Sequence, residues 1–285
     1  MFRLAHFSDP HIGPLPRPSL GELAGKRATG YLNWLAGRGN HHRMDVLDRL
    51  VREIAAADPD HVAVTGDLIN LGLAAEIGPA RAFLQRLGAP DRVTVVPGNH
   101  DAYHLATVAE MYRAWSPWLE GDDAGSEDRR YAFPSLRVRG QVALIGLNSG
   151  LPTPPFMATG FLGQRQIETL GDLLADTARQ GLARVVLIHH PPFDIGAQKR
   201  LLDHAGVTAT IAKAGAEAVL HGHTHKGTTH NLPGAAGPIP VIGAPSASAA
   251  AGGRHEAAAW NLVTIDGEPG AWRVHVERKG TVGGG

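Results

Sequence analysis

The sequence predicts a layered α/β domain that ends in antiparallel strands. Short runs rich in valine and isoleucine alternate with longer amphipathic segments up to residue 225, as buried strands alternate with helices in α/β proteins. Beyond residue 225 the helical pattern stops, and the apolar runs are separated by turn residues instead. We therefore expect one domain over residues 1–285.

The strands are predicted from the short apolar runs. They are Phe2–Ser8, His61–Thr65, Arg92–Val96, Gln141–Leu147, Arg184–Ile188, Ala218–Leu220, Val241–Ile242, Trp260–Ile265 and Trp272–Glu277. The residues between the last two strands include Asp266, Gly267, Pro269 and Gly270, which favour a turn. The end of the chain is therefore expected to form a hairpin.

The helices are predicted from apolar residues that recur every three or four positions. In Met44–Ala57 they form one face, and Asp58-Pro59 ends the helix. A second helix is expected to begin at Pro79, because proline suits the first helical turn. Two more helices are predicted from apolar residues at helical spacing over 105–115 and Gln164–Arg179.

Composition narrows the class of protein. Hydrophobic residues make up 43% and charged residues 19%, as in a globular protein with a full core. Lys plus Arg and Asp plus Glu both number 27, so no excess of basic charge points to a nucleic-acid polymer as a partner. The chain has no cysteine, so a metal must be held by nitrogen and oxygen atoms. With neither a secretory signal nor a transmembrane run in this sequence, we expect a cytoplasmic protein, and a homo-oligomer stays open.

Residues of the metal-ligand type follow five of the predicted strands. The blocks are Asp9-Pro10-His11, Gly66-Asp67, Gly98-Asn99-His100-Asp101, His189-His190 and His221-Gly222-His223-Thr224-His225. Each block alone has an ordinary explanation, such as an Asx turn, a helix cap or a histidine-rich surface tract. Because ligands of α/β sheets bind at the carboxyl ends of strands, the five blocks together favour one shared site.

Local geometry adds expectations about individual side chains. Residues two apart on an extended chain point to the same side, which pairs Asp9 with His11. Neighbouring residues point to opposite sides, so only one of His189 and His190 is expected to bind a metal. Asp101 is expected to hold the ring of the preceding histidine in place.

Over residues 1 to about 225, the chain resembles the calcineurin-like, purple-acid-phosphatase-like metallophosphoesterase superfamily. The resemblance lies in the order of the motifs, which is D-x-H, G-D, G-N-H-D, a strand-terminal His and G-H-x-H. The resemblance implies a four-layer αββα sandwich of two mixed β-sheets flanked by helices. It also implies a hydrolase that cleaves phosphoester bonds with two metal ions. The Asn-His-Asp and His-His-Pro-Pro blocks are similar to those of bacterial class III cyclic-nucleotide phosphodiesterases.

The resemblance also implies roles for single residues. It implies that one ion is held by Asp9, His11 and His225, that the other is held by Asn99, His189 and His223, and that Asp67 bridges the two. Asn99 and His100 would contact the phosphate, and His100, with Asp101 as the second catalytic residue, would protonate the leaving oxygen. Two such ions activate a bridging hydroxide for in-line attack on phosphorus, and nitrogen and oxygen ligands suit manganese, iron, zinc or cobalt.

The substrate expected from this resemblance is a cyclic nucleotide or a similar small phosphodiester. Two other activities stay open, a phosphomonoesterase and a hydrolase of lipid-linked or nucleotide pyrophosphates. A non-catalytic scaffold of the same fold is disfavoured, because every ligand position of the motif is filled.

The stretch at about 13–42 is longer than the core of such a domain needs. Ser19 and Glu22 match a capping box, and apolar residues follow at helical spacing. Because the stretch follows His11, we expect a helical insert at the rim of the site, with Tyr31 and Trp34 contacting the non-phosphate part of the substrate. Packing on the domain, contact with another subunit and contact with a lipid surface are the alternatives.

Overall fold

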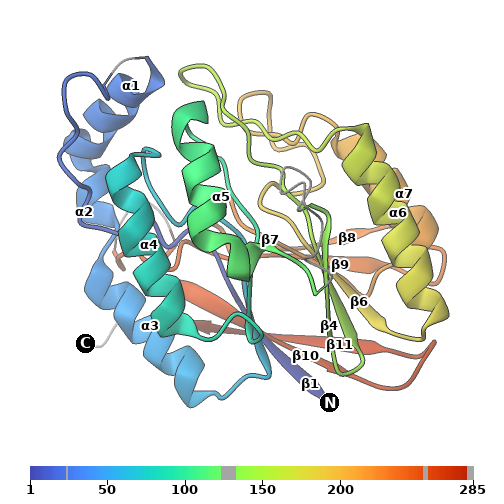
Figure 1. Cartoon of the computed structure of the whole chain (residues 1–285). Helices are drawn as coiled ribbons and strands as arrows, with labels where there is room; N and C mark the ends of the chain where they lie inside the picture. The colour runs from blue at the N-terminus through green and yellow to red at the C-terminus, as the bar shows by residue number, and fades with distance from the viewer. Residues whose placement is uncertain (24, 123–132, 253–255, 281–285) are drawn as a thin grey trace.

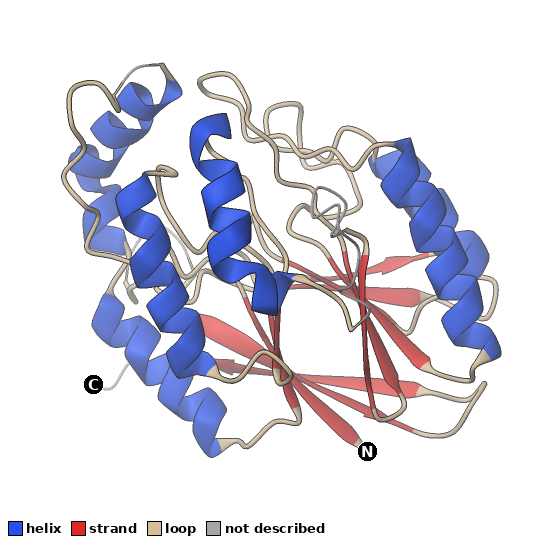
Figure 2. Cartoon of the chain, viewed as in Figure 1, coloured by secondary structure: helices blue, strands red, loops and turns tan. Residues whose placement is uncertain are grey.

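Two mixed β-sheets lie face to face in the computed structural model, which describes residues 1–23, 25–122, 133–252 and 256–280. Helices flank the strands on two sides (Figure 1, Figure 2). The strand orders are β11-β10-β1-β2-β3 and β4-β5-β6-β7-β9-β8. This architecture confirms the αββα sandwich expected from the sequence.

The first sheet combines three parallel strands with an antiparallel hairpin. Its strands are β1 (Phe2–Phe7), β2 (His61–Val64), β3 (Val93–Val95), β10 (Ala259–Asp266) and β11 (Arg273–Gly280). β1 to β3 are parallel, and β10 pairs antiparallel with both β1 and β11. The carboxyl ends of β1 to β3 therefore lie at one edge of this sheet.

The second sheet has four parallel strands between two antiparallel edge strands. Its members are β4 (Ser135–Arg139), β5 (Val142–Gly146), β6 (Ala183–Leu187), β7 (Ala218–His221), β8 (Thr229–Leu232) and β9 (Ile239–Gly243). The edge strands β4 and β8 were not predicted. β4 carries Arg137 and Arg139 in place of an apolar run, and three of the four β8 residues are exposed.

Helices cover the outer faces of both sheets. They are α3 (Met44–Ala56), α4 (Ala74–Leu87) and α5 (Leu105–Leu119) beside the first sheet, and α6 (Gln164–Arg179) and α7 (His204–Ala214) beside the second. α7, which buries only Val207 and Ile211, was not predicted. α4 begins before Pro79, because Glu76 accepts the amide hydrogen of Leu73 at 2.9 Å and fixes an earlier first turn.

The alternation of side chains along β6 divides the core. Val185 and Leu187 pack in the cluster that fills the space between the sheets and reaches α3 to α5. Val186 and Ile188 point the other way and pack with residues of α6 and α7. Because strand residues alternate between faces, one strand serves two apolar layers. The loops at its carboxyl end are thereby held by packing on both sides.

The insert forms a kinked helical segment made of α1 (Lys26–Asn33), a π-helical turn (Trp34–Arg38) and α2 (Gly39–His41). Ser19 and Glu22 exchange the hydrogen bonds of a capping box, but they close a turn, and the helix starts only at Lys26. Tyr31 of α1 packs against Leu71, Leu73 and Tyr103, which lie in the loops that precede α4 and α5. Figure 1 shows the segment in dark blue. Within the described ranges, no helix combines the length and apolar character that a membrane crossing requires.

Candidate metal centre

The loops after β1, β2, β3, β6 and β7 bring the predicted ligands together. Two groups have ligand atoms within 4.8 Å of one another across the two sheets: Asp9, His11 and His225, and Asp9, Asp67 and His189. Further groups of this size join His189, His190 and His223, and His11, Asp67 and His100. Asp67 therefore shares neighbours with both expected ligand sets.

The carboxylate of Asp67 lies between two histidines. Its Oδ2 atom is 3.9 Å from Nε2 of His11 and 3.4 Å from Nε2 of His189. Its Oδ1 atom accepts the amide hydrogen of His100 at 2.7 Å. Oδ1 is thus fixed by a backbone hydrogen bond, and Oδ2 lies between the two histidines, where it could bind two ions.

The first ligand group contains a buried carboxyl oxygen without a hydrogen bond. Oδ2 of Asp9 accepts the amide hydrogen of His223 at 3.0 Å, whereas Oδ1 is buried and makes no hydrogen bond. The nearest basic atoms to Oδ1 are Nε2 of His225 at 3.1 Å and Nε2 of His11 at 3.9 Å. Nδ1 of His11 is 3.2 Å from the carbonyl of Ile69, an acceptor that favours its proton at Nδ1. A cation at this point would satisfy the buried Oδ1 atom of Asp9.

The second ligand group is arranged in the same way. Nε2 of His189 is 3.1 Å from Oδ1 of Asn99, and Nδ1 is 2.6 Å from the carbonyl of Thr65. Nε2 of His223 is buried and makes no hydrogen bond. The His223 and His189 rings are 5.1 Å apart. A backbone acceptor thus holds the far side of the His189 ring, which is the usual environment of a metal-binding histidine.

His190 is adjacent to this group, but both of its ring nitrogens have protein partners. Nδ1 is 2.8 Å from the hydroxyl of Ser149, and Nε2 is 3.1 Å from the carbonyl of Ala158. Burial lowers the pKa of His190 to about 3, so the ring is neutral and can donate only one of these bonds. The hydroxyl donates the other, and no lone pair of His190 is left for a metal.

Charge at the centre is set by Asp67. Burial opposes ionisation, but nearby histidines, chiefly His189 and His100, hold the pKa of Asp67 well below its usual range. Burial alone would lower the pKa of His189, yet the Asp67 carboxylate raises it to about 9. Asp67 is therefore ionised, and a cation that binds here replaces a proton on the histidine.

The backbone at the candidate ligands is strained. Five of them have φ angles in the left-handed region, which is costly for residues other than glycine: Asp9 at 52°, His11 at 41°, Asp67 at 56°, His223 at 66° and His225 at 54°. The expected pairs are therefore brought together by turns rather than by the alternation of an extended strand. Close approach is also required at Gly98, where a Cβ atom would collide with the Asp67 carboxylate.

Asp101 has a different role from the one expected. Its carboxylate accepts the amide hydrogens of Gly98, Asp67 and Leu68 at 2.8 Å each and that of Ile69 at 3.2 Å. The His100 ring is held instead by the carbonyl of Asn70, 2.5 Å from Nδ1. The prediction that Asp101 holds this ring was wrong, because both carboxylate oxygens accept hydrogen bonds from backbone amides of the turns that carry Asp67 and Gly98.

A cavity of about 570 Å³ opens over this centre. It is lined by Ala36, Gly37, His41, His42, Asp67, Asn99, His100, Ala158, Lys199, His223, Thr224 and His225. The insert contributes the first four of these residues and so forms one wall. Sequence analysis missed His41, His42 and Lys199, which belong to none of the motif blocks.

Tyr31 and Trp34, the expected substrate contacts, do not line this cavity. Tyr31 packs against the small cluster of Leu71, Leu73 and Tyr103. The Trp34 ring stacks on His42, with centroids 6.3 Å apart and planes inclined by 6°. The insert reaches the cavity through its carboxyl-terminal end, with Ala36, Gly37, His41 and His42.

Buried cations fasten the amino-terminal end of the insert. Arg27 is 6% exposed and donates to the carbonyls of Leu71, at 3.1 Å, and Gly72. Nζ of Lys26 donates to the Thr153 hydroxyl and to the carbonyl of Met157 at 2.9 Å. The wall is therefore attached both to the loop after Asp67 and to the loop after β5.

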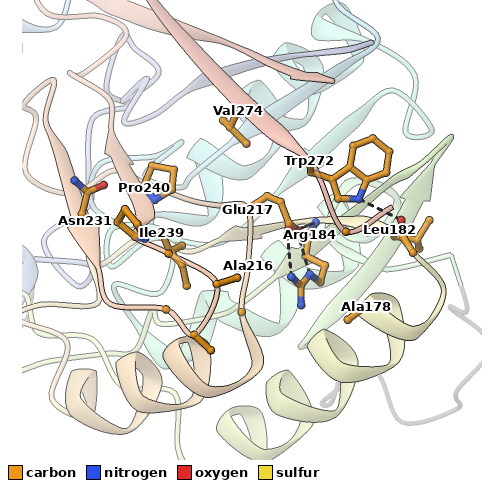
Figure 3. A pocket seen from close by; sticks show the side chains of 18 residues that line it. Ala178, Leu182, Arg184, Ala216, Glu217, Asn231, Ile239, Pro240, Trp272 and Val274 are labelled. Atoms are coloured by element: carbon orange, nitrogen blue, oxygen red, sulfur yellow. Dashed lines mark hydrogen bonds and ion pairs between the residues drawn. The ribbon is translucent and has the colours of Figure 1, made fainter. Parts of the chain in front are cut away.

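A second cavity, of about 660 Å³, lies at the amino ends of β6 and β7 (Figure 3). The guanidinium group of Arg184 in its lining forms an ion pair with Glu217 at 2.8 Å. Trp272 closes one side and donates its Nε1 hydrogen to the carbonyl of Gly181. None of the expected ligands lines this cavity, whereas Asp67, Asn99, His223 and His225 line the first one.

An αββα sandwich with two adjoining ligand groups at its strand ends defines a metallophosphoesterase. The family model for calcineurin-like phosphoesterases matches residues 2–227, which include every candidate ligand, and the chain belongs to this family. It is 30% identical over 195 residues to the glycerophosphodiester phosphodiesterase GpdQ of Enterobacter lignolyticus. The match covers 68% of this chain and 58% of that protein, so the chain corresponds to little more than half of the relative.

Solved structures share the fold at low sequence identity. A dimetal phosphatase from Danio rerio matches with a TM-score of 0.62 and 12% identity, over 96% of this chain and 98% of that one. A purple acid phosphatase from yellow lupin (Lupinus luteus) matches with a TM-score of 0.60 and 12% identity, over 100% of this chain and 52% of that one. These likenesses establish the architecture.

Proposed function

We propose that the protein hydrolyses a small phosphodiester, such as a cyclic nucleotide or a related diester, at a centre of two metal ions. The observation that carries the proposal is the position of Oδ2 of Asp67 between His11 and His189, with a separate ligand group on each side. The choice of a diester is supported by the name of the relative, a glycerophosphodiester phosphodiesterase.

We assign the first ion to Asp9, His11 and His225. The second goes to Asn99, His189 and His223, and Asp67 is shared. The buried Oδ1 of Asp9 and Nε2 of His223, which make no hydrogen bonds, fit this assignment. Cations held there supply charge neutralisation for the phosphoryl oxygens and lower the pKa of water toward neutrality. Nitrogen and oxygen donors suit manganese, iron, zinc or cobalt.

His100 is the proposed acid. It lines the cavity, and the Asn70 carbonyl keeps a proton on Nδ1. A second proton on Nε2 can then pass to the leaving oxygen while the ring stays in place. Asn99 and His100 leave the same turn after β3, so both can approach one phosphate. The turn itself is held by Asp101 through the amide of Gly98.

A panel of substrates tests the proposal. The metal-reconstituted enzyme should be assayed with cyclic nucleotides, a glycerophosphodiester, an aryl diester, the matching aryl monoester and a nucleotide pyrophosphate. We expect the highest kcat/KM for a diester. A higher value for the monoester or the pyrophosphate would replace this proposal by one of the alternatives. A cytoplasmic location and a homo-oligomer stay predictions.

A further inference from the structure

His42 is a buried side chain beside the first ligand group that the proposed mechanism does not use. It is 7% exposed and lines the cavity. Its ring centroid is 4.5 Å from that of His11 and 6.2 Å from that of His225. Among the described residues, it belongs to none of the groups whose ligand atoms lie within 4.8 Å of one another. It is therefore next to the metal ligands without being one of them.

The ring of His42 is fixed from two sides. Nδ1 is 2.8 Å from the hydroxyl of Ser248, and Trp34 stacks on the ring. The backbone is held as well, because His42 forms an antiparallel bridge with Ala249 and the amide of Arg43 donates to the carbonyl of Ser248 at 2.8 Å. A side chain held this firmly has little conformational entropy left to lose when it binds a ligand.

A line of buried hydroxyl groups connects His42 with the metal centre. Oγ of Ser246 donates to the carbonyl of Asp9 at 2.7 Å and lies 3.4 Å from Oγ of Ser248, which is longer than an O–H···O hydrogen bond. The Ser248 proton can therefore go to Nδ1 of His42, 2.8 Å away, which leaves the ring proton on Nε2. Both serines are fully buried. Apolar side chains at these positions would be enough to fill the space. A row of buried hydroxyl groups can in addition fix the positions of the groups at its two ends. Its ends are a candidate metal ligand and the ring of His42.

His42 and His100 both lie against His11. The centroid of the His100 ring is 5.0 Å from that of His11, and both outer histidines line the cavity. Among the described lining residues, the carboxylate is Asp67, whereas His41, His42 and Lys199 offer hydrogen-bond donors. The wall formed by the insert is therefore suited to an anionic ligand that extends past the metal ions.

We propose that His42 is a substrate-binding residue, which donates a hydrogen bond from Nε2 to the phosphoester. His100 protonates the leaving oxygen, and His42 contacts an oxygen of the part of the substrate that keeps the phosphate after hydrolysis. Trp34 and Ser248 are positioning residues that act through the His42 ring. This inference rests on the proposed function for the reaction, but the contact itself requires only that the centre binds a phosphate group.

The test compares His42→Ala, His42→Gln and Ser248→Ala with His275→Ala, an exposed histidine on β11, as the matched control. Four quantities are measured on each metal-loaded variant: metal content, melting temperature, kcat and KM for a diester, and the dissociation constant of inorganic phosphate. A hydrogen bond to a charged group is worth about a tenfold change in binding. We expect His42→Ala to weaken phosphate binding and raise KM by about that factor, with metal content kept and kcat changed less.

His42→Gln should recover part of the phosphate affinity because its amide can donate, and Ser248→Ala should cause a smaller loss in the same direction. Unchanged phosphate affinity in both His42 variants would overturn the proposal, and so would the loss of one metal ion. The phosphate measurement does not depend on the substrate. A failure of the diester assignment would therefore appear in the wild-type substrate panel, and a failure of the His42 contact in the phosphate titration.

Discussion

Oδ2 of Asp67 lies 3.4 Å from Nε2 of His189, and this contact joins the two sheets of the sandwich. Asp67 follows β2 of the first sheet, and His189 follows β6 of the second. The same histidine donates to the carbonyl of Thr65 across the same boundary. The candidate metal centre therefore lies at the junction of the sheets, so binding of metal there would be coupled to their association.

Metal should be needed for activity and should also stabilise the fold. Chelation should abolish hydrolysis, and Mn²⁺ or a similar ion should restore it. Because ions bind the native state, a metal concentration of 100 times its dissociation constant should add about 2.7 kcal/mol to the free energy of unfolding. Activity assays and denaturant titrations of apo and reconstituted protein measure both effects. Full activity in thoroughly demetallated protein would falsify the mechanism.

Asp67→Asn should reduce activity more than any other single ligand substitution. The change removes the negative charge of the carboxylate that faces both ligand groups while it keeps the volume of the side chain. We expect both ions to bind more weakly, which elemental analysis after dialysis can measure. Asp9→Asn is the matched control, since Asp9 belongs to one assigned ion only. A variant of Asp67 that retains two ions per chain would contradict the bridging role.

His189→Ala and His190→Ala should differ in metal content. His189 directs Nε2 toward Asn99 and Asp67, whereas both nitrogens of His190 are engaged by Ser149 and Ala158. We expect the first variant to lose one ion per chain and the second to retain two. Metal stoichiometry at matched protein concentration settles the question. The reverse pattern would exchange the two assignments.

His100→Asn should keep the metals and lower turnover. A general acid contributes about 10²–10⁴-fold to the rate, and the loss should grow as the leaving group becomes a poorer one. A series of aryl diesters with leaving groups of different pKa measures this dependence. Loss of metal from the variant, or an equal loss of rate across the series, would argue against the role of His100 as an acid.

Asp101→Ala should destabilise the protein. The substitution leaves four backbone amides of the Asp67 and Gly98 turns without their acceptor, and each unsatisfied buried donor costs about 1–3 kcal/mol. We expect a lower free energy of unfolding together with weaker metal binding, both measured by denaturant titration with and without metal. Asp172→Ala, at an exposed position of α6, is the control. Stability equal to that of the control would show that Asp101 does not hold these turns.

Much of the candidate centre was accessible from the sequence, because its residues lie in short blocks directly after apolar strands. Strand position then predicts neighbours, since parallel strands end at one edge of a sheet. The argument from alternation named the pair Asp9 and His11, although both residues have left-handed backbone geometry. The expectation that Asp101 holds the His100 ring was wrong, because adjacency in sequence says nothing about which amides a buried carboxylate will accept.

By itself the sequence determined the family and the chemistry of the donors, since apolar periodicity and short motif blocks are local properties of the chain. Only the tertiary structure decided which atoms of those donors are committed to the backbone and which face the cavity. It also decided the partner of His42, because Ser248 is 206 positions away and belongs to no motif. Contacts of this kind depend on how loops from different elements pack, which no local pattern of residues encodes.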